Sequence, residues 1–106
     1  MPKYLFHGTF TAQGAKGVAE EGGTARMKAV EKLAQSVGGK LESYYFAFGD
    51  TDYYIVCDLP DNKAAAAASL TVGGSGATSN KTTILMTAAE MDEAAKLKAA
   101  YRPPGA

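Results

Sequence analysis

The sequence has no excess of charge of either sign. Its 106 residues include 11 basic and 11 acidic side chains, which gives a formal net charge of zero. Proteins that bind nucleic acid or anionic membranes normally carry a strongly basic surface. Neither nucleic acid nor a membrane is therefore expected as a partner.

Cysteine and long hydrophobic runs are also scarce. The single cysteine, Cys57, can close no internal disulfide and forms no C-x-x-C motif, which favours a reducing compartment. No stretch approaches the roughly 20 apolar residues of a membrane-spanning helix, and residues 1–5 lack the apolar core of a signal peptide. We therefore expect a cytoplasmic protein with one domain over residues 1–106.

Clusters of aromatic and β-branched residues predict four strands. The predicted strands cover residues 3–10, 41–48, 53–59 and 81–86. The second and third are separated only by Gly49-Asp50-Thr51-Asp52, a combination typical of turns. These two strands are therefore expected to form a hairpin.

Helices are predicted between the strands and after the last one. Residues 11–23 contain four glycines, each of which lowers helix stability by about 1 kcal/mol relative to alanine, so only a weak helical turn followed by a break is expected there. A proper helix should follow, with Thr24 as its N-cap. Its apolar face comprises Met27, Val30, Leu33, Ala34 and Val37, and Arg26, Lys28, Glu31, Lys32 and Gln35 lie elsewhere.

Two further helices are expected over residues 63–70 and 88–99. Thr87 and Glu90 match the capping-box pattern that starts the second of these helices. Residues 101–106 contain two prolines and no periodicity, which predicts a tail, with the option that it docks on a neighbouring subunit.

The order of elements predicts an α+β, ferredoxin-like βαββαβ fold with a four-stranded antiparallel sheet and a C-terminal helix. In the second and third strands apolar residues occupy both alternating sets of positions. In the third strand, Tyr53, Ile55, Cys57 and Leu59 alternate with Tyr54 and Val56. In the second strand, Tyr44, Phe46 and Phe48 alternate with Leu41, Tyr45 and Ala47. The sheet face not covered by helices should then be covered by a second copy, as in a dimeric α/β barrel. The alternative is a monomer with a tyrosine-lined open face.

His7 is the only histidine and the only group with an ordinary pKa near neutrality. Its neighbours by topology are Cys57, Asp58 or Tyr54 on the third strand. A lone strand histidine is more often a sheet-surface residue than a base. Cys57 lies in an apolar run, where burial should raise its pKa and keep the thiol inert.

Motifs for metals, nucleotides and RNA are incomplete. Asp50 and Asp52 provide too few converging oxygen ligands for a metal site, and we expect their carboxylates to accept hydrogen bonds from local amides of the hairpin turn. The glycines of residues 14–17 and 73–76 complete no phosphate-binding motif, and we interpret both stretches as flexible connections, with residues 11–23 as a conceivable gate over the sheet. Residues 52–58 lack the basic and glycine residues of an RNA-recognition strand. No cofactor or metal is expected.

Segments spread along the chain carry a family resemblance. They are residues 3–5, Thr11, Gly14, residues 30–33, residues 38–40, Tyr45, Gly49, Asp52 and residues 58–61. Together they resemble the GYD domain family over residues 3–93. The family is named for a Gly-x-Tyr-Asp type motif, of which this sequence keeps Gly49 and Asp52 but has Thr51 in place of the tyrosine. The resemblance implies a small bacterial ferredoxin-like protein, similar in architecture to dimeric α/β barrels, and implies no established reaction.

Three functional hypotheses follow. The first is a homodimer or larger homo-oligomer that binds a small, largely apolar molecule between sheet and helices. Its candidate ligand-binding residues are Tyr4, Phe6, Tyr45, Tyr54 and Val56. The second is a cofactor-independent enzyme of the dimeric α/β barrel type, acting on a small aromatic substrate, with His7 and Tyr54 as proton-transfer groups. The third is assembly without a ligand.

Overall fold

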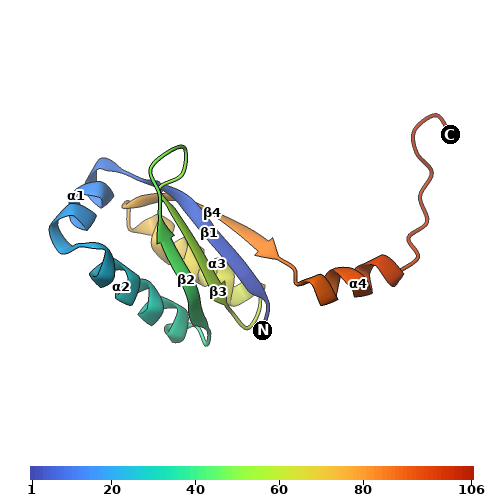
Figure 1. Ribbon diagram of the computed structural model, residues 1–106, viewed down its shortest axis with the longest axis horizontal. Helices are drawn as coiled ribbons and strands as arrows, with labels where there is room; N and C mark the ends of the chain where they lie inside the picture. Colours follow the sequence, from blue (N-terminus) through green and yellow to red (C-terminus); the bar gives the residue numbers. More distant parts are fainter.

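Four strands form one antiparallel sheet in the computed structural model, which describes residues 1–106 (Figure 1). The elements are β1 (Lys3–Phe10), α1 (Ala12–Glu21), α2 (Gly23–Ser36), β2 (Lys40–Phe46), β3 (Tyr53–Asp58), α3 (Asn62–Gly74), β4 (Thr78–Leu85) and α4 (Ala88–Lys96). The strand order across the sheet is β2-β3-β1-β4. The predicted α+β class and four-stranded antiparallel sheet are confirmed.

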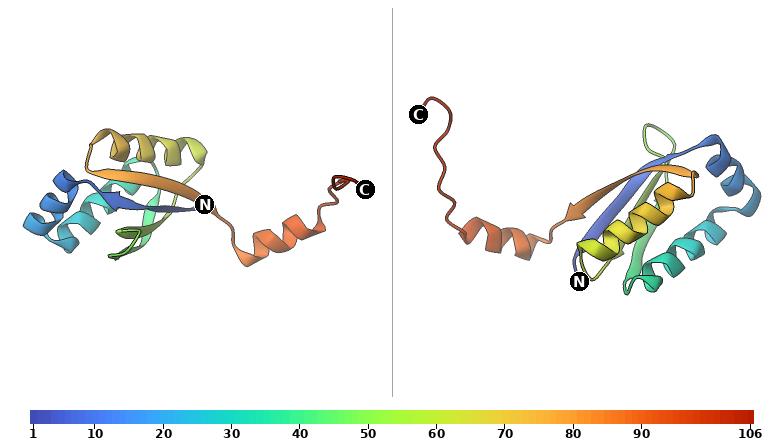
Figure 2. Two further views of the ribbon diagram at one scale, coloured as in Figure 1. Left: turned by 90° about the horizontal axis from the view of Figure 1, so that it is seen from above. Right: turned by 180° about the vertical axis from the view of Figure 1, so that it is seen from behind.

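Helices α2 and α3 both lie over one face of the sheet. Helix α2 packs against β2 and α3 packs against β4, and Figure 2 shows α3 lying across the back of the strands. Because directly paired residues of antiparallel strands point to the same side, the pairs Tyr4–Cys57 and Phe6–Ile55 both face the helices. The opposite side, here called the open face, is covered by no helix.

The hydrophobic core lies where the helix-covered face meets α2 and α3. Its buried members are Tyr4, Phe6, Val30, Ala34, Tyr53, Ile55, Cys57, Leu59, Ala65 and Ala68. The hydroxyl of Tyr4 donates to Oδ1 of Asn62 at 2.7 Å, which joins β1 to the first turn of α3. Burial raises the pKa of the Cys57 thiol to about 11, so the prediction of a buried cysteine with a raised pKa is confirmed.

A β-bulge in β2 changes which residues face the core. Leu41 pairs with Cys57, and after the irregularity between Leu41 and Ser43, Tyr44 pairs with Ile55. The extra residue places Leu41 and Tyr44 on the same face, and both pack against the core. The prediction that they lie on opposite faces is therefore wrong, because strict alternation does not hold through a bulge.

Helix α1 is longer than the weak turn predicted for residues 11–23. The Thr11 hydroxyl caps it, accepting from the Gly14 amide at 3.2 Å and donating to the Gly76 carbonyl at 2.8 Å. A Cβ at the buried Gly14 would lie 2.0 Å from the carbonyl oxygen of Ala77. Glycine thus permits a close approach between α1 and the start of β4, and this packing and the cap offset the low helix propensity.

Other boundaries differ by a few residues. Helix α2 begins after Gly22, whose φ of 83° suits glycine, rather than after a Thr24 cap. Strand β4 begins at Thr78 instead of Lys81, because its pairing with β1 continues as far as the pair Phe10–Thr78. Helix α3 extends past Leu70 to Gly74, and α4 ends at Lys96 instead of residue 99. The predicted capping box of Thr87 and Glu90 is confirmed.

Residues 86–106 form a C-terminal arm that projects from the rest of the chain (Figure 1). Helix α4 within the arm buries no residue. The exposed large apolar side chains of the arm are Met86, Met91, Leu97 and Tyr101.

None of the helices of the chain is both long and apolar enough to cross a bilayer. The cytoplasmic location stays a prediction.

Candidate ligand-binding cavity

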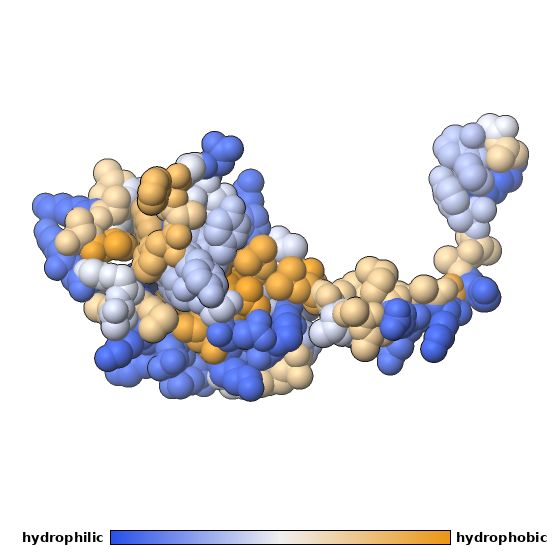
Figure 3. Space-filling model, in the orientation of Figure 1, coloured by the Kyte–Doolittle hydropathy of each residue, from blue (hydrophilic) through white to orange (hydrophobic).

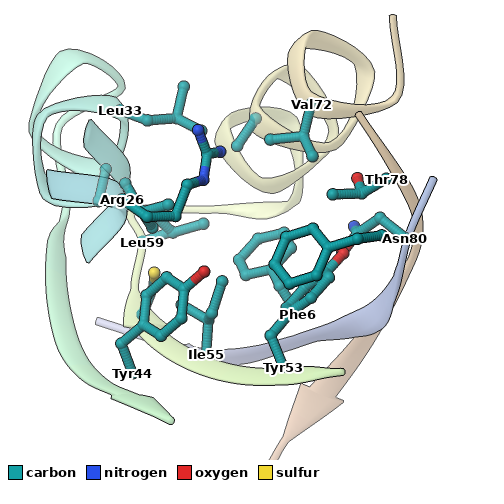
Figure 4. Close-up of a pocket in the computed structure, with 15 residues that line it drawn as sticks. Phe6, Arg26, Leu33, Tyr44, Tyr53, Ile55, Leu59, Val72, Thr78 and Asn80 are labelled. Carbon is teal, nitrogen blue, oxygen red and sulfur yellow. The ribbon is translucent and has the colours of Figure 1, made fainter. Parts of the chain in front are cut away.

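A cavity lies between the helix-covered face of the sheet and helices α2 and α3 (Figure 4). Its volume is about 40 Å³. Twelve of its 15 lining residues are hydrophobic. The cavity is therefore a narrow, apolar slot.

The sheet and helices α2 and α3 form the walls of the slot. Phe6 and Ile55 form its floor from β1 and β3, while Leu33 and Val72 face it from α2 and α3 (Figure 4). Two buried alanines, Ala34 of α2 and Ala68 of α3, also line the slot. Their small side chains leave the space that larger residues would fill.

Polar groups gather at the end of the slot beside β4. The hydroxyl of Tyr53 donates to Oδ1 of Asn80 at 2.7 Å. The buried hydroxyl oxygen of Thr78 has no hydrogen-bond partner. A Cβ at Gly8 would lie 2.0 Å from the Ser79 carbonyl oxygen and 2.9 Å from the Tyr53 hydroxyl. Glycine at this position therefore leaves room for the Tyr53 ring and its hydrogen bond.

Arg26 is the only charged residue that lines the slot. Its guanidinium group lies between α2 and α3 on the side of the cavity away from the sheet (Figure 4). No carboxylate lies within 4.0 Å of it, since the ion pairs of the chain involve only Lys3. Burial raises the pKa of the Tyr44 hydroxyl, and the nearby charge of Arg26 partly opposes that rise. Tyr44 is therefore a neutral donor beside a cation.

The predicted ligand-binding residues do not come together in one site. Phe6 lines the slot, and Tyr4 is in the core close to it without lining it. Tyr45, Tyr54 and Val56 lie on the open face, because their pairing register places them opposite to the core residues of the same strands. Ligand contact by these three residues stays a prediction, and it would need a site on the open face.

The open-face patch consists of Leu5, His7, Tyr45, Tyr54 and Val56. Figure 3 views this face and shows hydrophobic surface over part of the sheet with hydrophilic residues around it. The rings of His7 and Tyr54 stack with centroids 6.3 Å apart, and His7 Nε2 lies 3.1 Å from the Thr83 hydroxyl oxygen. No carboxylate contacts His7, so the ring lacks the acidic partner that commonly orients a histidine base.

A charged cluster at the edge of the patch holds β1, β2 and β3 together. Lys3 Nζ lies 2.8 Å from Asp58 Oδ1 and also pairs with Glu42. The hydrogen bond from Lys3 holds the pKa of the Asp58 carboxyl below its ordinary value of 3.8. Because this pKa is lower in the folded than in the unfolded state, the ionised carboxyl stabilises the fold at pH values above its unfolded pKa. That contribution is lost as the pH falls through the folded pKa.

Asp58→Asn is therefore expected to destabilise the protein more at pH 7 than at pH 3. Urea unfolding of both proteins at the two pH values measures this, with the difference in unfolding free energy shrinking as Asp58 of the wild type becomes protonated. An equal difference at both pH values would show that the ion pair with Lys3 does not account for the role of Asp58.

The motif residues of the hairpin have a structural role. The Asp52 carboxylate accepts from the Phe10 amide at 2.9 Å, and the Asp52 amide donates to the Gly8 carbonyl at 2.7 Å. The prediction that this carboxylate bonds local amides is wrong, because the end of β1 lies beside the hairpin. No atom lies within 4 Å of the position that a Cβ on Gly49 would occupy, so steric contact does not explain why this residue is a glycine. No group of three metal-ligating side chains occurs in the chain.

A second, shallower hollow lies beside Asp52 and Phe46. Its walls include Ala15, Val18 and Ala19 of α1. Helix α1 contributes no residue to the main slot. If residues 11–23 act as a gate, they would cover this hollow and not the slot.

Sequence reasoning missed the polar groups of the slot. Arg26 was expected away from the apolar face of its helix, yet it precedes Val30 and Leu33 by four and seven residues, the spacing of one helix face. Thr78 and Asn80 lie before the predicted start of the last strand. The helical spacing of Arg26 was an available signal, whereas the start of β4 depends on its pairing with β1.

Comparison with known proteins agrees with the resemblance seen in the sequence. A family model described as GYD domain matches residues 4–95. The chain matches no curated protein and no solved structure. The matched region contains every residue that lines the slot and all four strands except Lys3, the first residue of β1. The chain belongs to the GYD domain family.

Proposed function

We propose that the protein binds a small, largely apolar molecule in the slot between its sheet and helices. The observation that carries this proposal is an apolar cavity lined by one buried hydroxyl, that of Thr78, without a hydrogen-bond partner. Protein interiors are close-packed, and buried polar atoms nearly always have partners. The slot departs from both rules, since Thr78 has a buried, unpartnered hydroxyl and Ala34 and Ala68 leave space. No cofactor is proposed.

Ala68→Leu tests this proposal by filling the slot. The added methyl groups would occupy ligand space, so the affinity for a neutral flat probe, 2-naphthamide, should fall at least about 10-fold. Isothermal titration calorimetry or naphthyl fluorescence measures the affinity. The matched control is Ala67→Leu, the same change one residue away at an exposed position of the same helix, which should leave the affinity unchanged.

Two results would contradict binding in the slot. One is absence of binding to the wild type at millimolar probe. The other is an equal loss of affinity in both leucine variants. The enzyme hypothesis places its chemistry on the open face, where His7 and Tyr54 lie together. His7→Ala should therefore leave probe affinity in the slot unchanged, whereas an enzyme using His7 as its base would lose about 10²–10⁴-fold in rate.

We also propose that the fold is ferredoxin-like and that two copies pack through their open faces, as in dimeric α/β barrels. The β-α-β-β-α-β order is retained, with α1 as an additional helix after β1. The open-face patch supports the assembly because it exposes two tyrosines, 70% of Tyr45 and 43% of Tyr54, around Leu5 and Val56. Tyrosine is enriched at interfaces, where its ring is buried and its hydroxyl finds a partner.

The C-terminal arm gives a second argument for assembly. Helix α4 has nine residues, and isolated helices shorter than about 12–15 residues are marginal in water. None of the residues of α4 is buried against the rest of the chain, and Met91 and Leu97 are exposed. A second copy is the partner that we propose for this arm.

A further inference from the structure

We propose that the ligand is an organic acid, an alkyl or aryl carboxylate whose apolar body fills the slot and whose carboxylate binds Arg26 at the mouth. This inference rests on the proposed function and specifies its ligand class. It depends on three features: an arginine without an acidic partner, neutral donors on the walls, and no acidic residue in the lining.

Arg26 is the first feature. It is partly buried among Leu33, Val72 and the aromatic floor, yet it has no carboxylate within 4.0 Å. A partly buried charge without an acidic partner loses hydration that an opposite charge would offset. The planar guanidinium group presents paired N–H donors that match both oxygens of a carboxylate. A ligand carboxylate would supply the missing partner.

Neutral donors near Arg26 are the second feature. In Figure 4 the Tyr44 hydroxyl points toward the guanidinium group from the floor of the slot. Burial raises the pKa of both Tyr44 and Tyr53, so both hydroxyls keep their protons at neutral pH. The Tyr53 hydroxyl already donates its proton to Asn80. Tyr44 could therefore donate to an acid beside Arg26.

The lining itself is the third feature. No aspartate or glutamate lines the slot, so an anion entering it meets one cation and no like charge. The remaining hydrophobic lining suits an apolar body. A cationic ligand would lack a counter-charge beside Arg26, and a wholly apolar ligand would leave the guanidinium group unpaired.

The alternative is that Arg26 only covers the core with its aliphatic stem and keeps its charge in water. The two accounts differ in how they treat a charged and a neutral ligand of the same shape. We compare 2-naphthoate with 2-naphthamide, which share the ring system and differ in the charge of the head group.

Wild-type protein should bind 2-naphthoate at least about 10-fold more tightly than 2-naphthamide at low ionic strength, because a charge-assisted hydrogen bond is stronger than a neutral one. Arg26→Gln should remove this preference while leaving the affinity for 2-naphthamide within about 3-fold. Lys28→Gln makes the same charge change at an exposed position of the same helix and should alter neither affinity. Arg26→Met, which keeps an apolar stem, repeats the test if the glutamine variant is unstable.

The outcomes separate the two proposals. Equal binding of acid and amide by the wild type would overturn the organic-acid inference and leave binding in the slot intact. An acid preference lost equally in Arg26→Gln and Lys28→Gln would assign it to general surface charge and also overturn the inference. Failure of both probes to bind would contradict the proposed function itself, and the inference with it.

Discussion

Replacing Tyr4 with alanine is expected to lower the free energy of unfolding by about 3–5 kcal/mol. Only 2% of Tyr4 is exposed, at the centre of a core shared by β1, β3 and α3. Removing its ring leaves a cavity in that core, and removing its hydroxyl leaves Asn62 Oδ1 without its donor. Single domains are stable by about 5–15 kcal/mol, so this change removes much of the total.

Urea unfolding at pH 7 measures this effect, and two variants separate its causes. Tyr4→Phe loses only the hydrogen bond and should cost about 1–2 kcal/mol. Leu70→Ala removes a large side chain that is 77% exposed on α3, and it should cost no more than about 0.5 kcal/mol. A Tyr4→Ala protein as stable as Leu70→Ala would contradict the core described above.

Tyr54→Glu is expected to raise the dissociation constant of the proposed dimer by roughly 10³-fold. A central interface tyrosine typically contributes at least about 2 kcal/mol, and a two-fold symmetric interface contains each substitution twice. Tyr54 pairs with both Tyr45 and His7, so the new carboxylate lies in the middle of the open-face patch. Analytical ultracentrifugation over a concentration series measures the shift.

Leu70→Glu is the matched control for this dimer test. It introduces the same carboxylate at an exposed apolar position on α3 and should leave the dimer unchanged. Circular dichroism confirms that both variants are folded. A wild-type protein that stays monomeric at high micromolar concentration would contradict assembly through the open face, as would equal dissociation of the two variants.

Local sequence signals predicted much of the fold. The hairpin between β2 and β3 follows from two β-rich runs around Gly49–Asp52, and the start of α4 follows from Thr87 and Glu90, which cap each other within one turn. In both cases the interactions that form the element lie within a few residues of each other. Such features need no knowledge of the rest of the chain.

Tertiary contacts decided the features that the sequence did not predict. Helix α1 depends on the approach of Gly14 to Ala77, 63 positions further along the chain. The bulge after Leu41 reverses the alternation of β2, which a strictly alternating pattern cannot reveal. These contacts exist only once β4 and β3 are paired with their neighbours.

The candidate site was predicted in location but only partly in composition. A cavity between sheet and helices was one of the hypotheses drawn from the sequence, and Phe6 lines the slot that the structure has there. The tyrosines of the open face were assigned to the same cavity because parity alone does not say which face the helices cover. Arg26 was overlooked because its charge was taken as evidence of a solvent-facing position, although its helical spacing matches the apolar face.

Native mass spectrometry of the protein isolated gently from its source tests the central claim, that the slot holds a small molecule. We predict a homo-oligomer that carries one small organic acid per subunit in the wild type and loses it in Ala68→Leu but not in Ala67→Leu. Wild-type protein with no bound molecule, or the same bound mass in all three proteins, would contradict the claim.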